Sequence, residues 1–231
     1  MTEILQAYDR EIMTLLNMGD SHTVGSDLFF WMISQILVWL PVFVMFLYAL
    51  FKNKRKEFFV LVGLTAIVFL LCDQISASLL KPLFARPRPS HDSIIEGLLQ
   101  YVYEYRGGAY GFPSSHATNG FGFAVFSCLL FRYKPYTICT ILWAILFSYS
   151  RIYLGVHFPG DILVGSLLGI GLGFFCYWLY KKYQEKHNFY YSSSSSIDCT
   201  STGYKKRDII RIIIALFTVL FTLLCVSLQV R

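Results

Sequence analysis

KPLFARPRP at 81–89, GFPSSHA at 111–117 and SRIYLGVHFPGD at 150–161 are the three segments that decide the fold of this chain. Each segment collects cations, hydroxyl groups or histidines, and each lies at the edge of a long apolar run. Charged groups are costly inside a hydrocarbon layer, so this position places the segments at a membrane surface. The sequence therefore predicts that the three segments form one polar site there.

Composition supports the membrane interpretation. The 231 residues are 55% hydrophobic and only 15% charged, whereas a soluble domain is usually about 25% charged. A helix needs about 20 apolar residues to cross a bilayer, and any single run could instead be a buried core helix. Several such runs, however, leave too little polar surface for a soluble fold. The candidate spans are 28–51, 57–80, 117–132, 136–154, 162–180 and 209–228.

We therefore expect an all-α integral membrane protein, a six-transmembrane-helix bundle that forms a single domain over 1–231. The motif core is 70–165, and 209–228 is an additional C-terminal span. Apolar residues recur at helical spacing over 2–17, which favours an N-terminal amphipathic helix lying on the membrane, with a short soluble helix as the alternative. The acidic first 27 residues do not have the pattern of a secretory signal peptide.

Basic residues indicate the orientation. They gather in the turn at 52–56, at 132–134 and along 181–207, and with six spans all three lie on one side. The positive-inside rule makes that side cytoplasmic, so the three polar segments face outward. The net charge of +6 is assigned to inner turns that meet anionic lipid, and no nucleic-acid-binding motif is present.

Two further features have structural interpretations. The serine-rich stretch 189–204 is expected to be a flexible inner linker. The six cysteines have no CxxC spacing, and five of them lie within predicted spans. We expect them to be free thiols that behave as small apolar side chains.

The first polar segment offers cations for phosphate. Lys81 lies where the second span ends, and Arg88 follows seven residues later in a proline-stiffened stretch. Lysine supplies a point charge, and arginine supplies a planar fork that matches phosphate oxygens. A basic cap that snorkels from a membrane helix is the alternative interpretation.

The second segment opens a helix. Ser114 and Ser115 precede an apolar run, which is an N-cap signature. The free N–H groups of a first helical turn bind anions, and His116 at the same end can donate a proton. An ordinary helix cap with an interfacial histidine is the alternative.

The third segment supplies a candidate nucleophile. His157 and Asp161 are four residues apart, so the carboxylate can reach the imidazole across one helical turn. A carboxylate on one ring nitrogen leaves the other nitrogen free to attack. Arg151 adds a further phosphate fork, and Asp161 can cap the span that follows. A capped helix with an unrelated histidine is the alternative.

Together the segments resemble the motifs of the type 2 phosphatidic acid phosphatase superfamily, which also contains the vanadium haloperoxidases. The family pattern is Lys-x6-Arg-Pro, then Pro-Ser-Gly-His, then Ser-Arg-x5-His-x3-Asp. Ser115 replaces the glycine, and its N–H can still donate to phosphate. The matching positions are Lys81 with Arg88-Pro89, Pro113-Ser114-Ser115-His116, and Ser150-Arg151 with His157 and Asp161.

The resemblance implies a role for each of these residues. His157 would attack phosphorus to form a phosphohistidine, with Asp161 orienting it. His116 would protonate the leaving oxygen and then activate water. The phosphate-binding groups would be Lys81, Arg88, Ser114, the Ser115 N–H and Arg151. No cofactor and no metal ion are expected, because the site is basic and offers no acidic ligand cluster.

The implied activity is that of a metal-independent lipid phosphate phosphatase in the bacterial inner membrane, with the active site facing the periplasm. Undecaprenyl pyrophosphate is placed first among substrates, because that carrier is recycled on the outer face. Lipid A phosphates come next, then phosphatidylglycerophosphate and phosphatidic acid, and no residue separates them. A non-catalytic membrane protein that binds phospholipid, or a haloperoxidase, remains a rival. The oligomeric state is left open.

Overall fold

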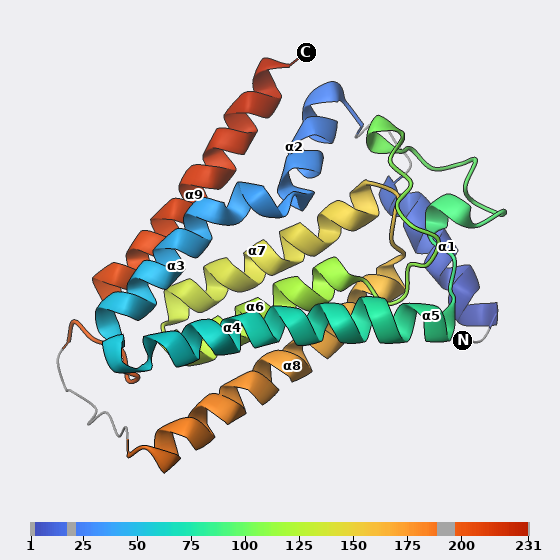
Figure 1. The fold of residues 1–231 in the computed structure, drawn as a ribbon. Coiled ribbons are helices and arrows are strands. Elements are labelled where there is room, and N and C mark those ends of the chain that lie inside the picture. The colour runs from blue at the N-terminus through green and yellow to red at the C-terminus, as the bar shows by residue number, and fades with distance from the viewer. Residues whose placement is uncertain (1–2, 18–21, 189–196, 231) are drawn as a thin grey trace.

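Helices make up nearly all the regular structure of the chain (Figure 1). The computed structural model describes residues 3–17, 22–188 and 197–230, and these ranges contain isolated β-bridges but no strand. The α-helices are α1 Glu3–Asn17, α2 Val24–Ser34, α3 Leu40–Asn53, α4 Phe58–Asp73, α5 Lys81–Phe84, α6 Ser115–Phe131, α7 Lys134–Tyr153, α8 Pro159–Lys186 and α9 Lys206–Gln229.

Within the described ranges, four helical stretches are long and apolar enough to cross a membrane. They are Ile36–Asn53, Arg55–Phe84, Pro159–Lys186 and Lys206–Gln229. The expectation of an all-helical, multi-pass membrane protein is therefore confirmed. The other two predicted spans correspond to α6 and α7, of 17 and 20 residues, which are not among these four.

The first predicted span is not one helix. A continuous helix over 28–51 was expected, but α2 ends at Ser34 and Gln35 has extended backbone, with φ −85° and ψ 123°. A 3₁₀ turn, Ile36–Trp39, precedes α3, whose second residue is Pro41. A proline lacks an N–H and its ring clashes with the preceding turn, so an unkinked helix cannot run through it. Helix α2 instead turns away from α3 and packs on α7 and α9 (Figure 1).

Helices α6 and α8 form the closest pair at the centre of the bundle. Glycines at four-residue intervals, Gly165, Gly169 and Gly173, line the side of α8 that faces α6. A Cβ at Gly165 would meet the Ser114 carbonyl oxygen at 2.5 Å, so only glycine allows this approach. Small residues at this spacing let helices pack backbone to backbone in membranes. The contact brings the beginning of α6 beside the beginning of α8.

The serine-rich linker makes specific contacts in the part that the structure describes. Residues 189–196 lie outside the described ranges. Residues 197–204 form a compact turn in which Thr200 N–H donates to the Tyr204 carbonyl (2.8 Å), and Tyr204 is buried. The Tyr204 ring packs edge-on against Phe131 of α6, and the flexibility of the linker as a whole stays a prediction.

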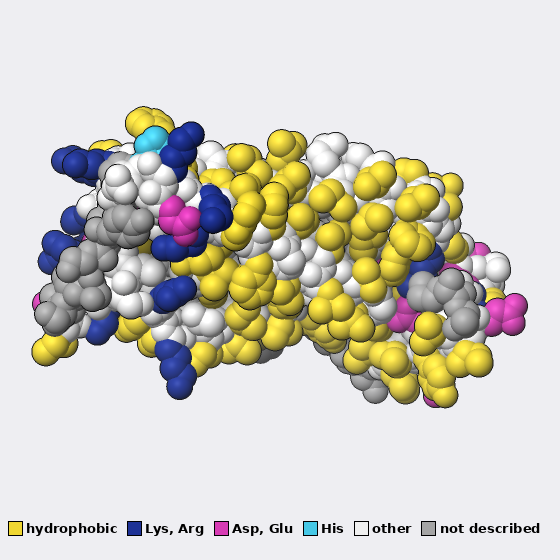
Figure 2. Space-filling model, turned by 90° about the horizontal axis from the view of Figure 1, so that it is seen from below, with side chains coloured by type: hydrophobic (Ala, Val, Ile, Leu, Met, Phe, Trp, Pro, Cys, Tyr) yellow, Lys and Arg dark blue, Asp and Glu magenta, His cyan; other side chains and the backbone are white. Residues whose placement is uncertain are grey.

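The two ends of the molecule differ in charge. Figure 2 shows Lys and Arg side chains gathered at one end and hydrophobic side chains covering the middle. The α3–α4 turn and the beginning of α9 lie at the basic end, whereas α1, α5 and the first turn of α8 lie at the other (Figure 1). The basic turns and the three polar segments are thus at opposite ends of the bundle.

Candidate active site

Backbone hydrogen bonds tie the three polar segments together at the end where α6 and α8 begin. Ser114 N–H donates to the Asp161 carbonyl (3.0 Å), which joins the second segment to the third. Gly111 N–H donates to the Arg86 carbonyl (2.9 Å), which joins the second segment to the first. The segments that were expected to meet do meet, at one end of the bundle.

His157 lies at the centre of this cluster, in the turn between α7 and α8, and is 1% exposed. Its Nδ1 lies 3.4 Å from Asp161 Oδ2, longer than a normal hydrogen bond. Its Nε2 lies 3.1 Å from Arg88 Nη1. Since a guanidinium can only donate, Nε2 is the acceptor and Nδ1 carries the proton that faces Asp161.

Burial and the surrounding charges favour the neutral form of the His157 ring. Burial lowers its pKa well below the usual 6.5, and nearby positive groups lower that pKa further, Arg88 first. A neutral imidazole whose Nδ1–H faces a carboxylate can attack through Nε2. Arg151 and Lys81 are the next positive groups that lower the pKa of His157.

The two arginines of the site have unused donors. Arg88 and Arg151 are buried, and the Nε atom of each has no hydrogen-bond partner. Arg88 Nη1 also donates to the Val156 carbonyl (3.0 Å), which fixes the guanidinium beside His157. The Tyr105 ring lies 5.6 Å from Arg151 Cζ, in cation–π range. Buried donors without partners are rare in proteins and require an explanation, and a bound anion would supply one.

Lys81 reaches the cluster from a distorted helix. Residues Gln74–Leu80 form a π-helical segment directly before it, a distortion often found at functional sites. Lys81 Nζ donates to Ser115 Oγ (3.0 Å), and the Ser76 hydroxyl bonds to the same oxygen (2.8 Å). The serine that replaces the family's glycine therefore contributes its hydroxyl to hold the lysine, a contact that glycine cannot make.

Ser114 and His116 open α6. Ser114 is its N-cap as predicted, although its hydroxyl lies 3.5 Å from Ala117 N. The His116 ring stacks on Phe147 with centroids 5.3 Å apart. His116 also lines a cavity of about 270 Å³ together with Ser34 and Gln35. The break between α2 and α3 therefore forms part of the wall beside this histidine.

Asp161 caps α8, as expected, and does so from the third position of the helix. Phe158 is the N-cap of α8, and Asp161 lies in the first turn, where Oδ2 accepts the Phe158 N–H (3.0 Å). Its Oδ1 accepts from Arg86 Nη1 (2.8 Å), and Arg86 also pairs with Asp9 of α1. The sequence reasoning missed Asp9 and assigned no role to Arg86. Only the alternation of Arg86 with Arg88 was visible in the sequence.

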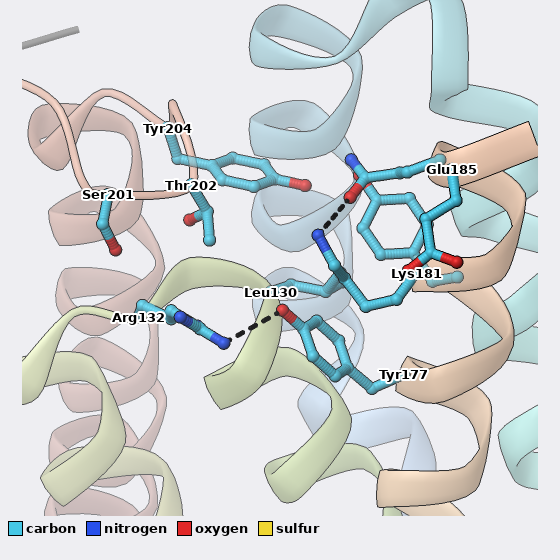
Figure 3. A pocket seen from close by; sticks show the side chains of 10 residues that line it. Leu130, Arg132, Tyr177, Lys181, Glu185, Ser201, Thr202 and Tyr204 are labelled. Carbon is cyan, nitrogen blue, oxygen red and sulfur yellow. Dashed lines mark hydrogen bonds between the residues drawn. The ribbon is translucent and has the colours of Figure 1, made fainter. Parts of the chain in front are cut away.

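A second cavity, of about 190 Å³, lies at the basic end and contains none of the motif residues (Figure 3). Two of the cations that line it donate to other residues of the wall. Lys181 Nζ donates to Gln184 Oε1 (3.1 Å), and Arg132 Nη2 donates to the Tyr177 hydroxyl (3.4 Å). Glu185 on the wall of this cavity adds a negative charge, so the cavity is a poorer site for an anion than the cluster around His157.

Comparisons with known proteins agree with the motifs. The family model described as PAP2 superfamily matches residues 62–185. The chain is 41% identical to lipid A 4'-phosphatase of Porphyromonas gingivalis, over 77% of this chain and 75% of that protein. It is 34% identical to lipid A 4'-phosphatase of Bacteroides thetaiotaomicron, over 90% and 91% of the two chains. It is 31% identical to undecaprenyl-diphosphatase of Sulfolobus acidocaldarius, over 72% and 76%.

A solved structure has a similar fold. The crystal structure of a transmembrane PAP2-type phosphatidylglycerolphosphate phosphatase from Bacillus subtilis superposes with a TM-score of 0.58. The match has 22% sequence identity and covers 80% of this chain and 88% of the other.

Proposed function

The chain belongs to the PAP2 superfamily and is a membrane phosphatase, and from that premise we propose that it removes a phosphate monoester from lipid A by way of a phosphohistidine. From the sequence alone, undecaprenyl pyrophosphate was ranked first among the possible substrates. The relatives favour the lipid A alternative, because two lipid A 4'-phosphatases match at 41% and 34% identity over most of the chain. The 4'-phosphate is accordingly the proposed target.

One observation supports the mechanism above all others, the arrangement of donors around His157. Its Nε2 faces Arg88, and the Nε atoms of Arg88 and Arg151 have no partner. A phosphoryl group placed there would take the Arg88 donor from Nε2 and free that lone pair for attack. Fixed donors aimed at developing negative charge typically contribute several kcal/mol to catalysis.

The proposed reaction has two steps. His157 Nε2 forms a bond to phosphorus as the bond from phosphorus to the sugar oxygen breaks, and protonated His116 gives that oxygen a proton. Burial, followed by Arg151, lowers the pKa of His116 to about 3, so the negative charge of the bound phosphate has to raise that pKa for His116 to carry the proton. A water molecule then attacks phosphorus and gives a proton to His116. The bond from phosphorus to Nε2 breaks, phosphate is released, and His157 returns to its neutral form. Asp161 holds the Nδ1–H throughout and stabilises the positive charge on the phosphorylated ring.

Lys81, Arg88 and Arg151 would hold the phosphate oxygens, with Ser114 and the Ser115 N–H at the start of α6. These donors neutralise the phosphate without a divalent cation, so we propose a metal-independent reaction. Among the residues that the structure describes, no three His, Cys, Asp or Glu side chains gather as possible metal ligands.

For the membrane arrangement we propose six spans, with α6 and α7 crossing inside the bundle alongside the four apolar stretches. The whole chain then acts as one phosphatase domain. The basic turns face the cytoplasm and the site faces the periplasmic side of the inner membrane. We also place α1 on the outer membrane surface, because Leu5 and Leu15 on its outward face are 55% and 74% exposed.

A panel of lipid phosphates tests this function. The purified protein is offered bisphosphorylated lipid A, undecaprenyl pyrophosphate, phosphatidylglycerophosphate and phosphatidic acid, each with EDTA present. We expect phosphate release from lipid A, with mass spectrometry locating the loss at the 4' position. A higher kcat/KM for undecaprenyl pyrophosphate would overturn the substrate assignment. Activity lost with EDTA and restored by a metal would overturn the metal-independent mechanism.

A further inference from the structure

We propose that Asp9 of α1 and Arg86 are positioning residues for the Asp161 carboxylate, so that α1 is a working part of the active site. The inference rests on the proposed function, in which Asp161 holds the proton-bearing nitrogen of His157. The proposed role involves α1, a helix that lies outside all three motifs, in contact with the turn that carries His157 and Asp161.

The geometry joins the three side chains in a row. Arg86 Nη1 donates to Asp161 Oδ1 at 2.8 Å, and Arg86 Nη2 donates to Asp9 Oδ2 at 2.6 Å. The second oxygen of Asp9 accepts the Gly160 N–H at 2.8 Å. The guanidinium plane also lies over the Phe158 ring, 4.3 Å from its centroid. All three charged side chains are buried, so solvent does not loosen the arrangement.

This row of contacts fixes where Asp161 points. One oxygen of Asp161 is held by Arg86, which leaves the other oxygen for the Phe158 N–H and His157 Nδ1. Asp9 holds Arg86 from the far side and also holds the loop through Gly160. Without that second anchor, the guanidinium could rotate and carry the Asp161 carboxylate away from the histidine.

The contacts among Asp9, Arg86 and Asp161 also determine how much negative charge Asp161 presents to His157. One guanidinium is shared between two carboxylates, so Asp161 is only partly neutralised by Arg86. If Asp9 loses its charge, Arg86 pairs with Asp161 alone. The carboxylate then offers less stabilisation to the positive ring that forms when His157 is phosphorylated.

Other contacts hold α1 in place without touching Asp161, and they provide a matched control. Arg10 Nε pairs with Asp92 Oδ2 at 2.9 Å. The Asn17 amide donates to the Tyr153 carbonyl (2.8 Å), and its oxygen accepts the Gln100 N–H (2.9 Å). If Asp9 only attached α1 to the rest of the protein, then removing the Arg10 contact should have the same effect on activity as removing the Asp9 contact.

The experiment compares Asp9→Asn, Asp9→Glu and Arg10→Gln in the full-length protein. We expect Asp9→Asn to lower kcat by about 10- to 100-fold, as is typical when a partner behind a catalytic group is removed, with KM changed by less than about twofold. Asp9→Glu should recover part of the loss. Arg10→Gln breaks the Arg10–Asp92 ion pair of α1 and should keep kcat within about twofold. Equal loss of kcat in Asp9→Asn and Arg10→Gln would overturn the proposal.

Two additions separate this proposal from the proposed function. Orthovanadate is used as a phosphate-like probe, with thermal stability as the readout. Wild-type stabilisation by vanadate that is weakened in Asp9→Asn supports the positioning role even if no lipid in the panel turns over. A second variant, Gly160→Ala, places a Cβ 2.6 Å from Asp9 Oδ2 and displaces that carboxylate with every charge retained. Undiminished kcat and vanadate stabilisation in Gly160→Ala would contradict the proposal.

Discussion

Both ends of this helical bundle bury charged side chains, but they use them differently. At the basic end, Lys54 and Glu57 are buried together, one cation with one anion. Glu57 Oε2 accepts hydrogen bonds from the Tyr180 hydroxyl (2.8 Å) and Gln184 Nε2 (2.9 Å), although Oε1 accepts none. Burial lowers the pKa of Lys54 to about 8, and the neighbouring Glu57 carboxylate opposes that shift. This network is largely balanced within the protein.

At the end of the bundle that holds His157, the cations outnumber the available acids. Asp161 and Asp9 are both engaged by Arg86. Lys81, Arg88 and Arg151 therefore have no carboxylate among their hydrogen-bond or ion-pair partners in the described structure. Burying unpaired positive charge is costly, and a ligand of opposite charge offsets that cost. The comparison suggests that a balanced buried network stabilises the fold, whereas an unbalanced one marks a binding site.

The largest expected effect comes from His157, the proposed nucleophile. His157→Ala should lower phosphate release by at least about a thousandfold, because no other group can form the phosphorylated intermediate. The measurement is phosphate release from the lipid A substrate, with helical content checked by circular dichroism. Turnover at the wild-type rate in a folded variant would contradict the assignment of His157.

A smaller effect is expected when one outer cation is exchanged for another. Arg151→Lys keeps the positive charge but loses the planar fork, so kcat/KM should fall by about 100-fold. Arg132→Lys makes the same exchange in the cavity at the basic end and should leave kcat/KM within about twofold. Similar losses in both variants would mean that the two ends do not differ as proposed.

The smallest effect on activity is expected from the buried network at the basic end. Glu57→Gln leaves Lys54 without its anion and should lower the free energy of unfolding by up to about 3 kcal/mol. The loss should shrink as the pH rises past 8, because neutral Lys54 no longer needs the carboxylate. Thermal denaturation in detergent between pH 7 and 9 measures the change. A fall in kcat beyond about twofold below the unfolding temperature would contradict a purely structural role.

Local sequence patterns predicted much of this structure. The cap at Ser114 and the four-residue spacing of His157 and Asp161 are short-range patterns, and the structure places the His157 and Asp161 side chains 3.4 Å apart. The prediction of one continuous helix over 28–51 was wrong, although the sequence contains Pro41. Apolar composition alone does not say where a membrane helix bends. Asp9 was missed because its partner Arg86 lies 77 residues away, and no local pattern encodes that pairing.

The sequence by itself determined that the chain is a helical membrane protein with the motifs of a PAP2 phosphatase. Hydrophobic length and short-range spacing suffice for those conclusions. Only the tertiary structure decided three features of the site. The first predicted span breaks between α2 and α3, and this break lies beside His116. Ser115 accepts a hydrogen bond from Lys81, and α1 contacts Asp161 through Arg86. Those features depend on which helices pack together, and packing is set by shape and charge complementarity between segments far apart in the chain.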